Sequence, residues 1–595
     1  MVNTTADKGP FSSCRLLCSG DLPGLFVPSQ NPSPVACIDA IDLDPEPEIS
    51  FTEGDYLSDE NLAALLRTWG ESVSPELPAQ IEHTIQSKIV VEEACIDGIV
   101  YKKGLSVELH EGTYLRILAV LQGPGGEIFL RGRRLVKLKD REEGPGPSWR
   151  REVLWVVNHD TTEVPLAVVQ CFCIVHFTNW PDIKTDTRSR NARYNELFCR
   201  LKETDEGEEM SMQYLHEDEA DEGFQFSPDF LRQQWRGDTF PFGGSRRPPD
   251  YAQATDIIEI DMGQPGEPLL IDLESDTSNH RQYTFGDAFC GAGGVSCGAE
   301  QAGLAIQWAF DKNEHAMSSY QMNFPTVWSE QADIFDLLTQ SDSQRLKVDI
   351  SHGSPPCQTF SPAHTINGPN DDANSACIFS CADLVRKVRP RVHTMEETCG
   401  LYERHKETFH RVILDFIEVG YSVRWGILNC MLYGVPQTRR RLIIIASGPG
   451  ESLPRLPKPT HAIPGSNSGL LDRPTIHSAI SSIPLGTRDH DVDGALARGL
   501  RYSRPPFNAD QPAGTITCNG GERNYHPSGT RGFTNREFAS LQTFPLHYRF
   551  GDREVRKQIG NAVPPILARA IYREIIKTLR KTDARASAEK TSVTI

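Results

Sequence analysis

The chain has 595 residues, of which 38% are hydrophobic and 24% charged, and its formal net charge is −19. This length predicts two to four domains, each large enough to bury a core of its own. No stretch approaches about eighteen uninterrupted apolar residues, and the first residues do not combine a basic start with an apolar block, so we expect neither a membrane span nor a signal peptide.

The charge is unevenly divided along the chain. Residues 281–595 carry 36 lysines and arginines against 31 aspartates and glutamates, whereas residues 1–280 carry 25 against 49. An acidic average therefore does not exclude a C-terminal half that faces DNA. The fifteen cysteines form no CxxC pair, so we expect no metal site, reduced thiols and an intracellular setting.

The first 280 residues predict three parts. Residues 1–85 are rich in proline and serine and then in acidic residues, which is typical of a flexible region. Residues 90–205 consist of short apolar runs rich in Val, Ile, Leu and Phe, separated by turns such as "GPGG", and this pattern predicts a β-rich domain. The acidic residues 206–280 predict a linker.

The β-rich segment resembles a bromo-adjacent homology (BAH) domain, a β module of chromatin proteins. The resemblance rests on "EIFLRGRRLVK", "RREVLWVVNHDTTEVPLAVVQCFCIVHF" and "NELFCRLKE". It implies a partner in chromatin. The alternative is a β-barrel insert without a binding role.

Residues 281–580 alternate strand-like runs with helical segments of ten or more residues. This order predicts an α/β domain with a doubly wound, mostly parallel sheet. Ligands of such sheets bind where the strands end, so the turns after the strands hold the informative residues. We expect a flexible tail over residues 581–595.

Three turns predict a pocket for an adenosine group. "DAFCGAGGVSCG" carries glycines at 291, 293, 294 and 298, which allow a sharp turn and a close approach to a ligand. Asp311 ends the second strand, where a carboxylate accepts hydrogen bonds from ribose hydroxyls, and Asp333 follows the third strand, within reach of an adenine amine. Because no P-loop lysine or pyrophosphate site accompanies them, S-adenosylmethionine fits better than a dinucleotide.

A fourth turn, "GSPPCQTFSP" (353–362), places Cys357 on a loop stiffened by two prolines. A free cysteine is far more often a buried apolar side chain than a nucleophile. Here the cysteine follows a strand end beside the expected methyl donor, where a helix N-terminus or a cation lowers the pKa of a thiol. The position favours a nucleophile.

Six segments together resemble the C5-cytosine DNA methyltransferases, in the order of that family and over about 300 residues. They are "DAFCGAGGVSCGAEQAG", "GSPPCQTFSPA", "EETCGL", "YGVPQTRRRLIIIA", "FTNREFASLQTFP" and "QIGNAVPP". The resemblance implies the fold of S-adenosylmethionine-dependent methyltransferases and a double-stranded DNA substrate whose cytosine is flipped out of the stack.

The resemblance also implies roles for individual residues. Cys357 matches the nucleophile that adds to cytosine C6, and Glu396 matches the glutamate that binds N3 and the amino group. Arg439 and Arg441 match arginines that position the base and phosphate, and Gln437 supports their loop. The implied cofactor-binding residues are Phe289, Gly291, Gly293, Gly294, Asp311, Asp333, Pro355, Asn561 and Val563.

Two departures from the family pattern refine the expectation. The family has Glu-Asn-Val where this chain has Glu396, Glu397 and Thr398. On an extended strand Glu397 faces away from Glu396. The target-recognition segment, about residues 450–513, is short, so we expect weak sequence preference, with Arg498, Arg501, Arg504 and Arg523 contacting phosphates.

These features are similar to the fungal RIP-defective group, which is linked to methylation or mutation of repeated DNA. We therefore expect a nuclear DNA (cytosine-5-)-methyltransferase of a fungus that acts in silencing. Two alternatives stay open: a chromatin or DNA-pairing scaffold with little turnover, which Glu397 and Thr398 favour, and a tRNA cytosine-5 methyltransferase.

Overall fold

The computed structural model describes residues 88–138, 151–157, 162–182, 196–237, 281–340, 342–356, 371–466, 468–518 and 524–593, together with Arg188, Asn191, Arg193 and Phe360. All of them belong to one compact unit, Thr84–Ile595. The region predicted to be flexible, residues 1–85, lies outside the described residues, as does Cys357. Among the described helices, none is both long and apolar enough to cross a membrane.

The N-terminal part is a β domain, as its apolar runs predict. Its central strands β4 and β5 are buried or half-buried along their whole length, and residues such as Val107, Leu115, Ile117 and Leu130 form its core. Whether it is a BAH domain stays a prediction. Its elements are β1 (Ile89–Val91), β2 (Glu93–Ile96), β3 (Ile99–Lys102), β4 (Ser106–Leu109), β5 (Tyr114–Gln122), β6 (Ile128–Lys137), β7 (Glu152–Val157), β8 (Thr162–Pro165), η3 (Leu166–Val168), β9 (Val169–Phe177), β10 (Glu196–Asp205), β11 (Met210–Tyr214), η4 (Glu217–Glu219) and α3 (Pro228–Arg236).

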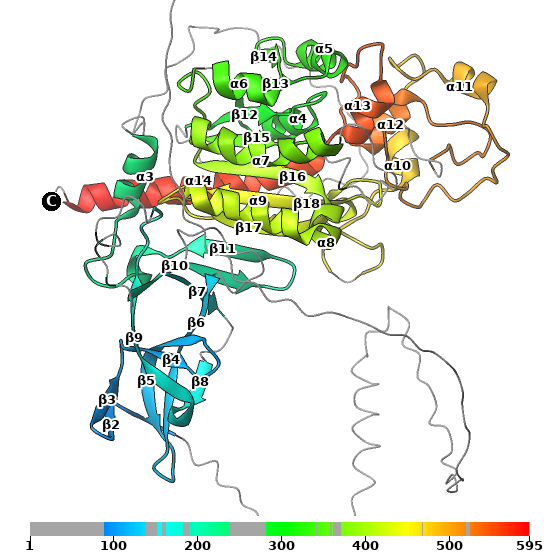
Figure 1. The fold of residues 1–595 in the computed structure, drawn as a ribbon. Helices are drawn as coiled ribbons and strands as arrows, with labels where there is room; N and C mark the ends of the chain where they lie inside the picture. The colour runs from blue at the N-terminus through cyan, green and yellow to red at the C-terminus, as the bar shows by residue number, and fades with distance from the viewer. Residues whose placement is uncertain are drawn as a thin grey trace, which may run out of the picture. The chain divides into compact units, whose positions relative to one another are not determined.

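The C-terminal part is the expected α/β domain. Helices α7 and α9 cover one face of its sheet, and α4 and α14 cover the other (Figure 1). Its elements are β12 (Thr284–Ala288), α4 (Gly294–Gln301), β13 (Ala305–Asp311), α5 (Glu314–Asn323), β14 (Trp328–Gln331), α6 (Ile334–Gln340), β15 (Ile350–Gly353), α7 (Asp371–Val388), β16 (Val392–Thr398), α8 (Cys399–Arg404), α9 (Lys406–Val419), β17 (Ser422–Asn429), η6 (Cys430–Tyr433) and β18 (Arg440–Ser447).

A smaller set of elements follows β18 and carries most of the predicted recognition segment. Its helix α12 begins with a capping box in which Thr534 accepts a hydrogen bond from the Glu537 amide. The elements are β19 (His461–Ala462), β20 (Leu471–Asp472), α10 (Ile476–Ile480), α11 (Val492–Arg498), α12 (Asn535–Leu541), α13 (Val555–Asn561) and α14 (Pro565–Val593).

The sheet of the α/β domain is mixed. Its order is β14-β13-β12-β15-β16-β18-β17, and the first five strands are parallel. Strand β18 runs antiparallel to both of its neighbours. Only a short connection separates β17 from β18, and a parallel neighbour would require a crossover of a dozen residues or more.

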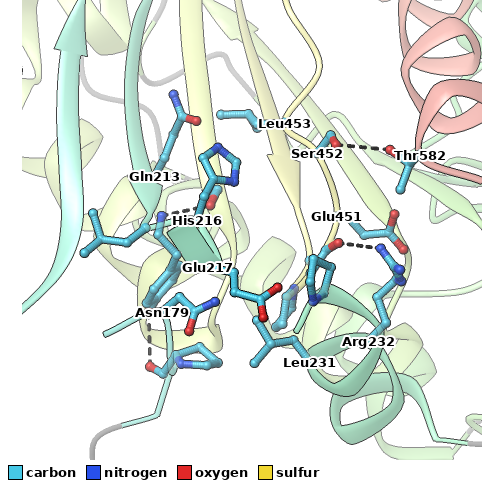
Figure 2. Close-up of a pocket in the computed structure, with 18 of the residues that line it drawn as sticks. Asn179, Gln213, His216, Glu217, Leu231, Arg232, Glu451, Ser452, Leu453 and Thr582 are labelled. Carbon is cyan, nitrogen blue, oxygen red and sulfur yellow. Dashed lines mark hydrogen bonds between the residues drawn. The ribbon is translucent and has the colours of Figure 1, made fainter. Parts of the chain in front are cut away.

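The predicted linker over residues 206–280 is wrong in its first part. Strand β11 pairs antiparallel with β17, so the sheet continues from the α/β domain into the N-terminal β domain. Helix α3 follows, begun by Ser227 and Pro228 and ended by Gly237. Its Arg232 donates to the Gly450 carbonyl at 2.7 Å (Figure 2). The acidic charge of this segment hid ordinary strand and helix-cap signals.

The predicted flexible tail over residues 581–595 is also wrong, because α14 continues to Val593. Asp583 forms an ion pair of 2.6 Å with the buried Arg391, and the Thr582 hydroxyl donates to Ser452 at 3.1 Å (Figure 2). These polar contacts hold the helix after its apolar spacing ends at Leu579.

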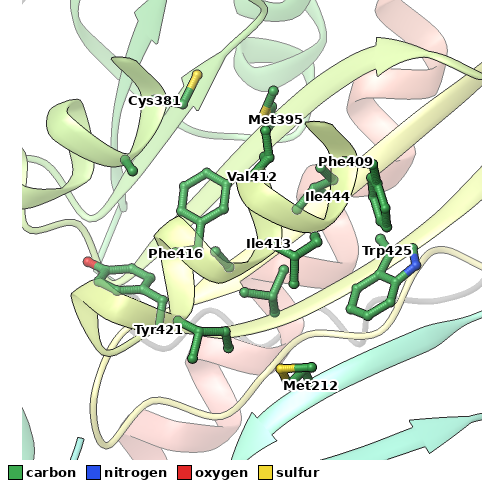
Figure 3. Packing of buried hydrophobic residues seen from close by; sticks show 14 of the residues in the cluster. Met212, Cys381, Met395, Phe409, Val412, Ile413, Phe416, Tyr421, Trp425 and Ile444 are labelled. Atoms are coloured by element: carbon green, nitrogen blue, oxygen red, sulfur yellow. The ribbon is translucent and has the colours of Figure 1, made fainter. Parts of the chain in front are cut away.

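The largest apolar cluster joins the two domains. Figure 3 shows Phe409, Ile413 and Phe416 of α9 packed over Trp425 of β17, with Met212 of β11 on the neighbouring strand. Because Met212 belongs to the segment that precedes residue 281, the core of the α/β domain extends into the N-terminal part.

Candidate functional site

The glycine-rich turn between β12 and α4 has the geometry of a ligand-binding loop. Phe289, Gly291 and Gly293 have φ angles of 57°, 53° and 91°. Such positive angles strain residues other than glycine, so Phe289 holds an unusual backbone. A Cβ atom at Gly291 would meet nothing within 4 Å, which leaves open space beside the turn.

The turn is tied to Asp311 at the end of β13. One carboxylate oxygen of Asp311 accepts from the Gly291 amide at 2.9 Å, and the other accepts from the Asn313 amide at 2.8 Å. Burial raises the pKa of Asp311, and these backbone hydrogen bonds oppose the shift. Asn313 also caps α5 by accepting from the Ala316 amide.

Asp333 lies beyond the neighbouring strand, immediately before α6. Its carboxylate accepts from the Phe335 amide at 3.0 Å and lies 4.0 Å from the Lys312 ammonium group. The side chain is 38% exposed, so it is accessible to a ligand. An adenosine group has hydroxyl and amine donors. The open space at Gly291 and the carboxylates of Asp311 and Asp333, which follow successive strands, fit such a group.

Gly294 and Val563 meet at the start of the last helix. A Cβ atom at Gly294 would lie 2.5 Å from the Val563 carbonyl oxygen, so only glycine fits there. Val563 is buried, whereas Asn561 is exposed and accepts from the Cys518 thiol at 2.8 Å. The structure therefore places the Val563 carbonyl against Gly294, and its contact with the cofactor stays a prediction.

Asp287 is a residue of this turn that our sequence predictions missed. It is fully buried, accepts from the Ser296 hydroxyl at 2.6 Å, and leaves its other oxygen without a partner among the described residues. Burial raises the pKa of Asp287 to about 7. The sequence could have indicated this residue, because Asp287 lies two residues before Phe289, at the end of a buried strand.

Glu396 and Arg441 meet on neighbouring strands. Strands β16 and β18 pair antiparallel with Thr398 opposite Arg441, and this register brings Arg441 Nε to 2.6 Å from Glu396 Oε1. Both side chains are largely buried. A paired arginine fixes the direction of a buried carboxylate. The structure thus brings together two of the residues predicted to be catalytic.

Glu397 is fully buried on the other side of β16. One of its oxygens accepts from the Thr398 amide at 2.9 Å, and the other has no hydrogen-bond partner among the described residues. Burial, followed by the charge of Glu396, holds the pKa of Glu397 well above its usual range. Folding therefore favours the protonated form of this carboxyl group.

Arg439 and Gln437 lie away from this pair and connect segments of the chain. The Arg439 guanidinium is 1% exposed and donates to the carbonyls of Ile516, Gly560 and Ala562, each at 3.1 Å. The Gln437 amide donates to the Leu541 carbonyl at 3.0 Å. We therefore reassign Arg439 from contact with base and phosphate to support of the site, because its donors point into the interior.

The nucleophile loop begins at the centre of the sheet. Strand β15 lies between β12, which leads to the cofactor turn, and β16, which carries Glu396. Ser354 donates its amide to the Ala288 carbonyl at 3.3 Å, and Pro355 is buried. Cys357 itself lies outside the described residues, and so does Arg523.

The other predicted phosphate contacts lie on the smaller set of elements. Arg498 forms a 3.5 Å ion pair with Asp491, and the Arg501 guanidinium lies 5.6 Å from the centre of the Tyr502 ring. Arg501 and Arg504 are exposed. The structure places both where an anionic partner can reach them.

A cavity of about 210 Å³ lies at the opposite end of the sheet (Figure 2). It is lined by the Gly448–Leu453 loop, β11, α3 and the end of α14. Because Val392 pairs with Ser447, this loop follows β18 at the end of β16 that is remote from Glu396. The cavity is thus separate from the candidate site. Among the described residues, no group of three His, Cys, Asp or Glu side chains is arranged to hold a metal ion.

A family model, sequence relatives and a solved structure each resemble part of this chain. The family model "C-5 cytosine-specific DNA methylase" matches residues 283–491 and 481–577. Type II methyltransferase M1.HphI of Haemophilus parahaemolyticus is 30% identical over 333 residues, which cover 49% of this chain and 87% of that protein. DNA (cytosine-5)-methyltransferase PliMCI of Paracentrotus lividus is 35% identical over 190 residues, covering 29% and 12%. The solved S. pombe Dnmt2 methyltransferase has a TM-score of 0.37 and 16% identity over 50% of this chain and 99% of that one.

Proposed function

Because the chain belongs to the C-5 cytosine-specific DNA methylase family, we propose that it methylates cytosine C5 in DNA through a transient covalent bond between Cys357 and C6. The cofactor of the family is S-adenosylmethionine, which supplies an electrophilic methyl group on a sulfonium. Phe289, Gly291, Asp311 and Asp333 would hold it beside the first turn.

The chemistry assigned to the protein begins with the Cys357 thiolate. Its sulfur would bond to C6, and the electron pair of the C5–C6 double bond would become available at C5. C5 would then take the methyl group as the sulfonium–methyl bond breaks, and S-adenosylhomocysteine would be the leaving group. A base then removes the C5 proton, the C5–C6 double bond forms again, and the sulfur leaves as thiolate. The target base must leave the duplex stack first, at a cost of a few kcal/mol.

One observation carries this proposal: the Glu396–Arg441 pair at the end of β16, the strand beside β15. Addition of sulfur at C6 increases negative charge on the ring, which a hydrogen bond to N3 and the amino group stabilises. Arg441 orients the Glu396 carboxylate for that contact. A scaffold without turnover has no requirement for a largely buried ion pair at this strand end.

We also propose a nuclear role in silencing repeated DNA in a fungus. The support is the BAH-like sequence of the N-terminal β domain, the Glu397-Thr398 pair, and a recognition segment too short for many base contacts. A partner on chromatin would then supply the targeting.

The test is methyl transfer from tritiated S-adenosylmethionine to unmethylated duplex DNA, hemimethylated DNA and tRNA in parallel. We expect label in duplex DNA with the wild-type chain and none with Cys357→Ala. Label confined to tRNA would show that tRNA, and not DNA, is the substrate. Binding of DNA and cofactor without any methyl transfer would favour the scaffold function.

A further inference from the structure

The geometry points to His352 as a positioning residue that ties the start of the Cys357 loop to the strand that carries Glu396. This inference rests on the proposed function of Cys357. His352 is buried on β15, and its two ring nitrogens contact two different elements. Nδ1 lies 2.8 Å from the Thr394 hydroxyl of β16, and Nε2 is hydrogen-bonded to the Ser354 hydroxyl.

These contacts lie next to the catalytic positions in the sequence. Ser354 precedes Cys357 by three residues, and Thr394 precedes Glu396 by two. Residues two apart on a strand share a face, so Thr394 and Glu396 lie on the same side of β16. The pairing of β15 with β16 ends at Gly353 and Met395. Beyond these residues the two strands no longer pair, and Ser354 is connected to β16 through its hydrogen bond to His352, which contacts Thr394.

The His352 ring is a neutral link in this network. Burial lowers the pKa of His352 to about 3, so the ring has one donor and one acceptor nitrogen. The nitrogen that carries the proton donates to its hydroxyl partner, and the other nitrogen accepts from the second hydroxyl. The Thr394 hydroxyl also lies 3.5 Å from the Ser351 carbonyl.

The network is anchored on the far side by the last helix. The Tyr572 hydroxyl of α14 lies 3.0 Å from the Thr394 hydroxyl, and its ring packs against Phe285 of β12 at 4.9 Å between ring centres. The two hydroxyls share one hydrogen bond. A side chain held from two strands and a helix has little freedom to move.

A second pair on the same strands provides a matched control. The Ser351 hydroxyl lies 2.8 Å from His393 Nδ1, and both residues are buried. The remaining nitrogen of His393 has no hydrogen-bond partner among the described residues. This pair therefore resembles His352 and Ser354 in chemistry, although Ser354 is only half-buried, and it does not reach the start of the nucleophile loop.

The experiment compares single-turnover methyl transfer by the wild-type chain, His352→Asn, His352→Gln, Ser354→Ala and Ser351→Ala at saturating cofactor and DNA. Ser354→Ala and His352→Asn should slow transfer about tenfold, because a displaced nucleophile loses its alignment. The KM values for both substrates should not change. His352→Gln, whose amide oxygen lies near the place of Nε2, should recover most of the rate.

Ser351→Ala should lower the melting temperature about as much as Ser354→Ala without slowing transfer. If the two serine variants slow transfer equally, or if neither does, His352 has only a structural role and the inference is overturned. Should His352→Asn fail to fold, Ser354→Ala decides alone. A wild-type chain without Cys357-dependent transfer would instead overturn the proposed function.

Discussion

The Arg441 guanidinium Nε lies 2.6 Å from Glu396 Oε1, between strands that run antiparallel at the centre of the molecule. The two residues come from motifs 45 positions apart in the sequence. Their pairing depends on the antiparallel direction of β18, because the register that places Thr398 opposite Arg441 also places Glu396 on the diagonal.

Removing this partner should reduce catalysis. Arg441→Ala leaves a largely buried Glu396 carboxylate without its cation, and we expect kcat to fall about 100-fold. The kcat of Arg441→Lys should lie between those of the wild-type chain and Arg441→Ala, because lysine keeps the charge but lacks the planar guanidinium group. Steady-state kinetics with duplex DNA would measure this. Arg440→Ala is the control, since Arg440 forms an exposed pair with Glu403 and should change kcat less than twofold. Equal losses in Arg440→Ala and Arg441→Ala would contradict the assignment.

Arg439 should matter for stability rather than for DNA contact. Arg439→Ala removes three buried hydrogen bonds, although the Ala562 carbonyl keeps a donor in Gln542, and we expect the free energy of unfolding to fall by about 3 kcal/mol. The salt dependence of DNA binding should stay unchanged. In contrast, the exposed Arg501→Ala should reduce the slope of log Kd against log salt by about 0.9, as loss of one phosphate contact does. If Arg439→Ala also reduced the slope of log Kd against log salt, Arg439 would contact a DNA phosphate after all.

Glu397 should make stability depend on pH. Its folded pKa lies above the unfolded value of 4.5, so the folded chain binds this proton more tightly than the unfolded chain. The resulting stability is complete below about pH 4.5 and is lost as pH rises through the folded pKa. Glutamine has the shape of glutamate but does not titrate. The free energy of unfolding of Glu397→Gln, relative to that of the wild-type chain, should therefore increase from about pH 5 to about pH 8. Urea unfolding at these two pH values measures the difference. Glu403→Gln, at an exposed site, is the control, and a pH-independent difference for Glu397→Gln would contradict the buried, protonated carboxyl.

The segment before residue 281 should be required for folding. A fragment of residues 281–595 lacks β11 and α3, which leaves Trp425 without Met212 and Tyr421 without the 3.1 Å hydrogen bond from Trp235. We expect this fragment to unfold without a cooperative transition, whereas a fragment that begins at residue 196 should retain one. Calorimetry of the two fragments distinguishes these outcomes. A cooperative transition in the shorter fragment would show that the α/β domain folds without β11 and α3.

The cofactor turn was predictable because its signals are local. A glycine-rich turn after a strand, followed by Asp311 at the end of the next strand, places these groups together through the rules of parallel sheets. The hydrogen bond from the Gly291 amide to Asp311 has that origin. The positions of Phe289 and Val563 near this turn follow from the same motifs.

The roles of Arg439 and Glu397 were not predictable, because burial depends on long-range packing. A run of three arginines gives no sign that the first would donate to carbonyls in two distant segments of the chain or that the third would pair with Glu396. Likewise, two adjacent glutamates predict opposite faces of a strand, as found, but not that the second would be sealed from water. Acidic residues that flank β11 concealed that strand, whose own residues, MSMQY, are uncharged.

The most direct test of the central claim is trapping with duplex DNA that contains 5-fluorocytosine, in the presence of S-adenosylmethionine. Fluorine at C5 cannot leave as a proton does, so an enzyme that bonds to C6 stays attached to the DNA. We predict a denaturation-resistant complex for the wild-type chain and its absence for Cys357→Ala. A wild-type chain that transfers methyl groups to ordinary DNA but forms no such complex would contradict the covalent mechanism.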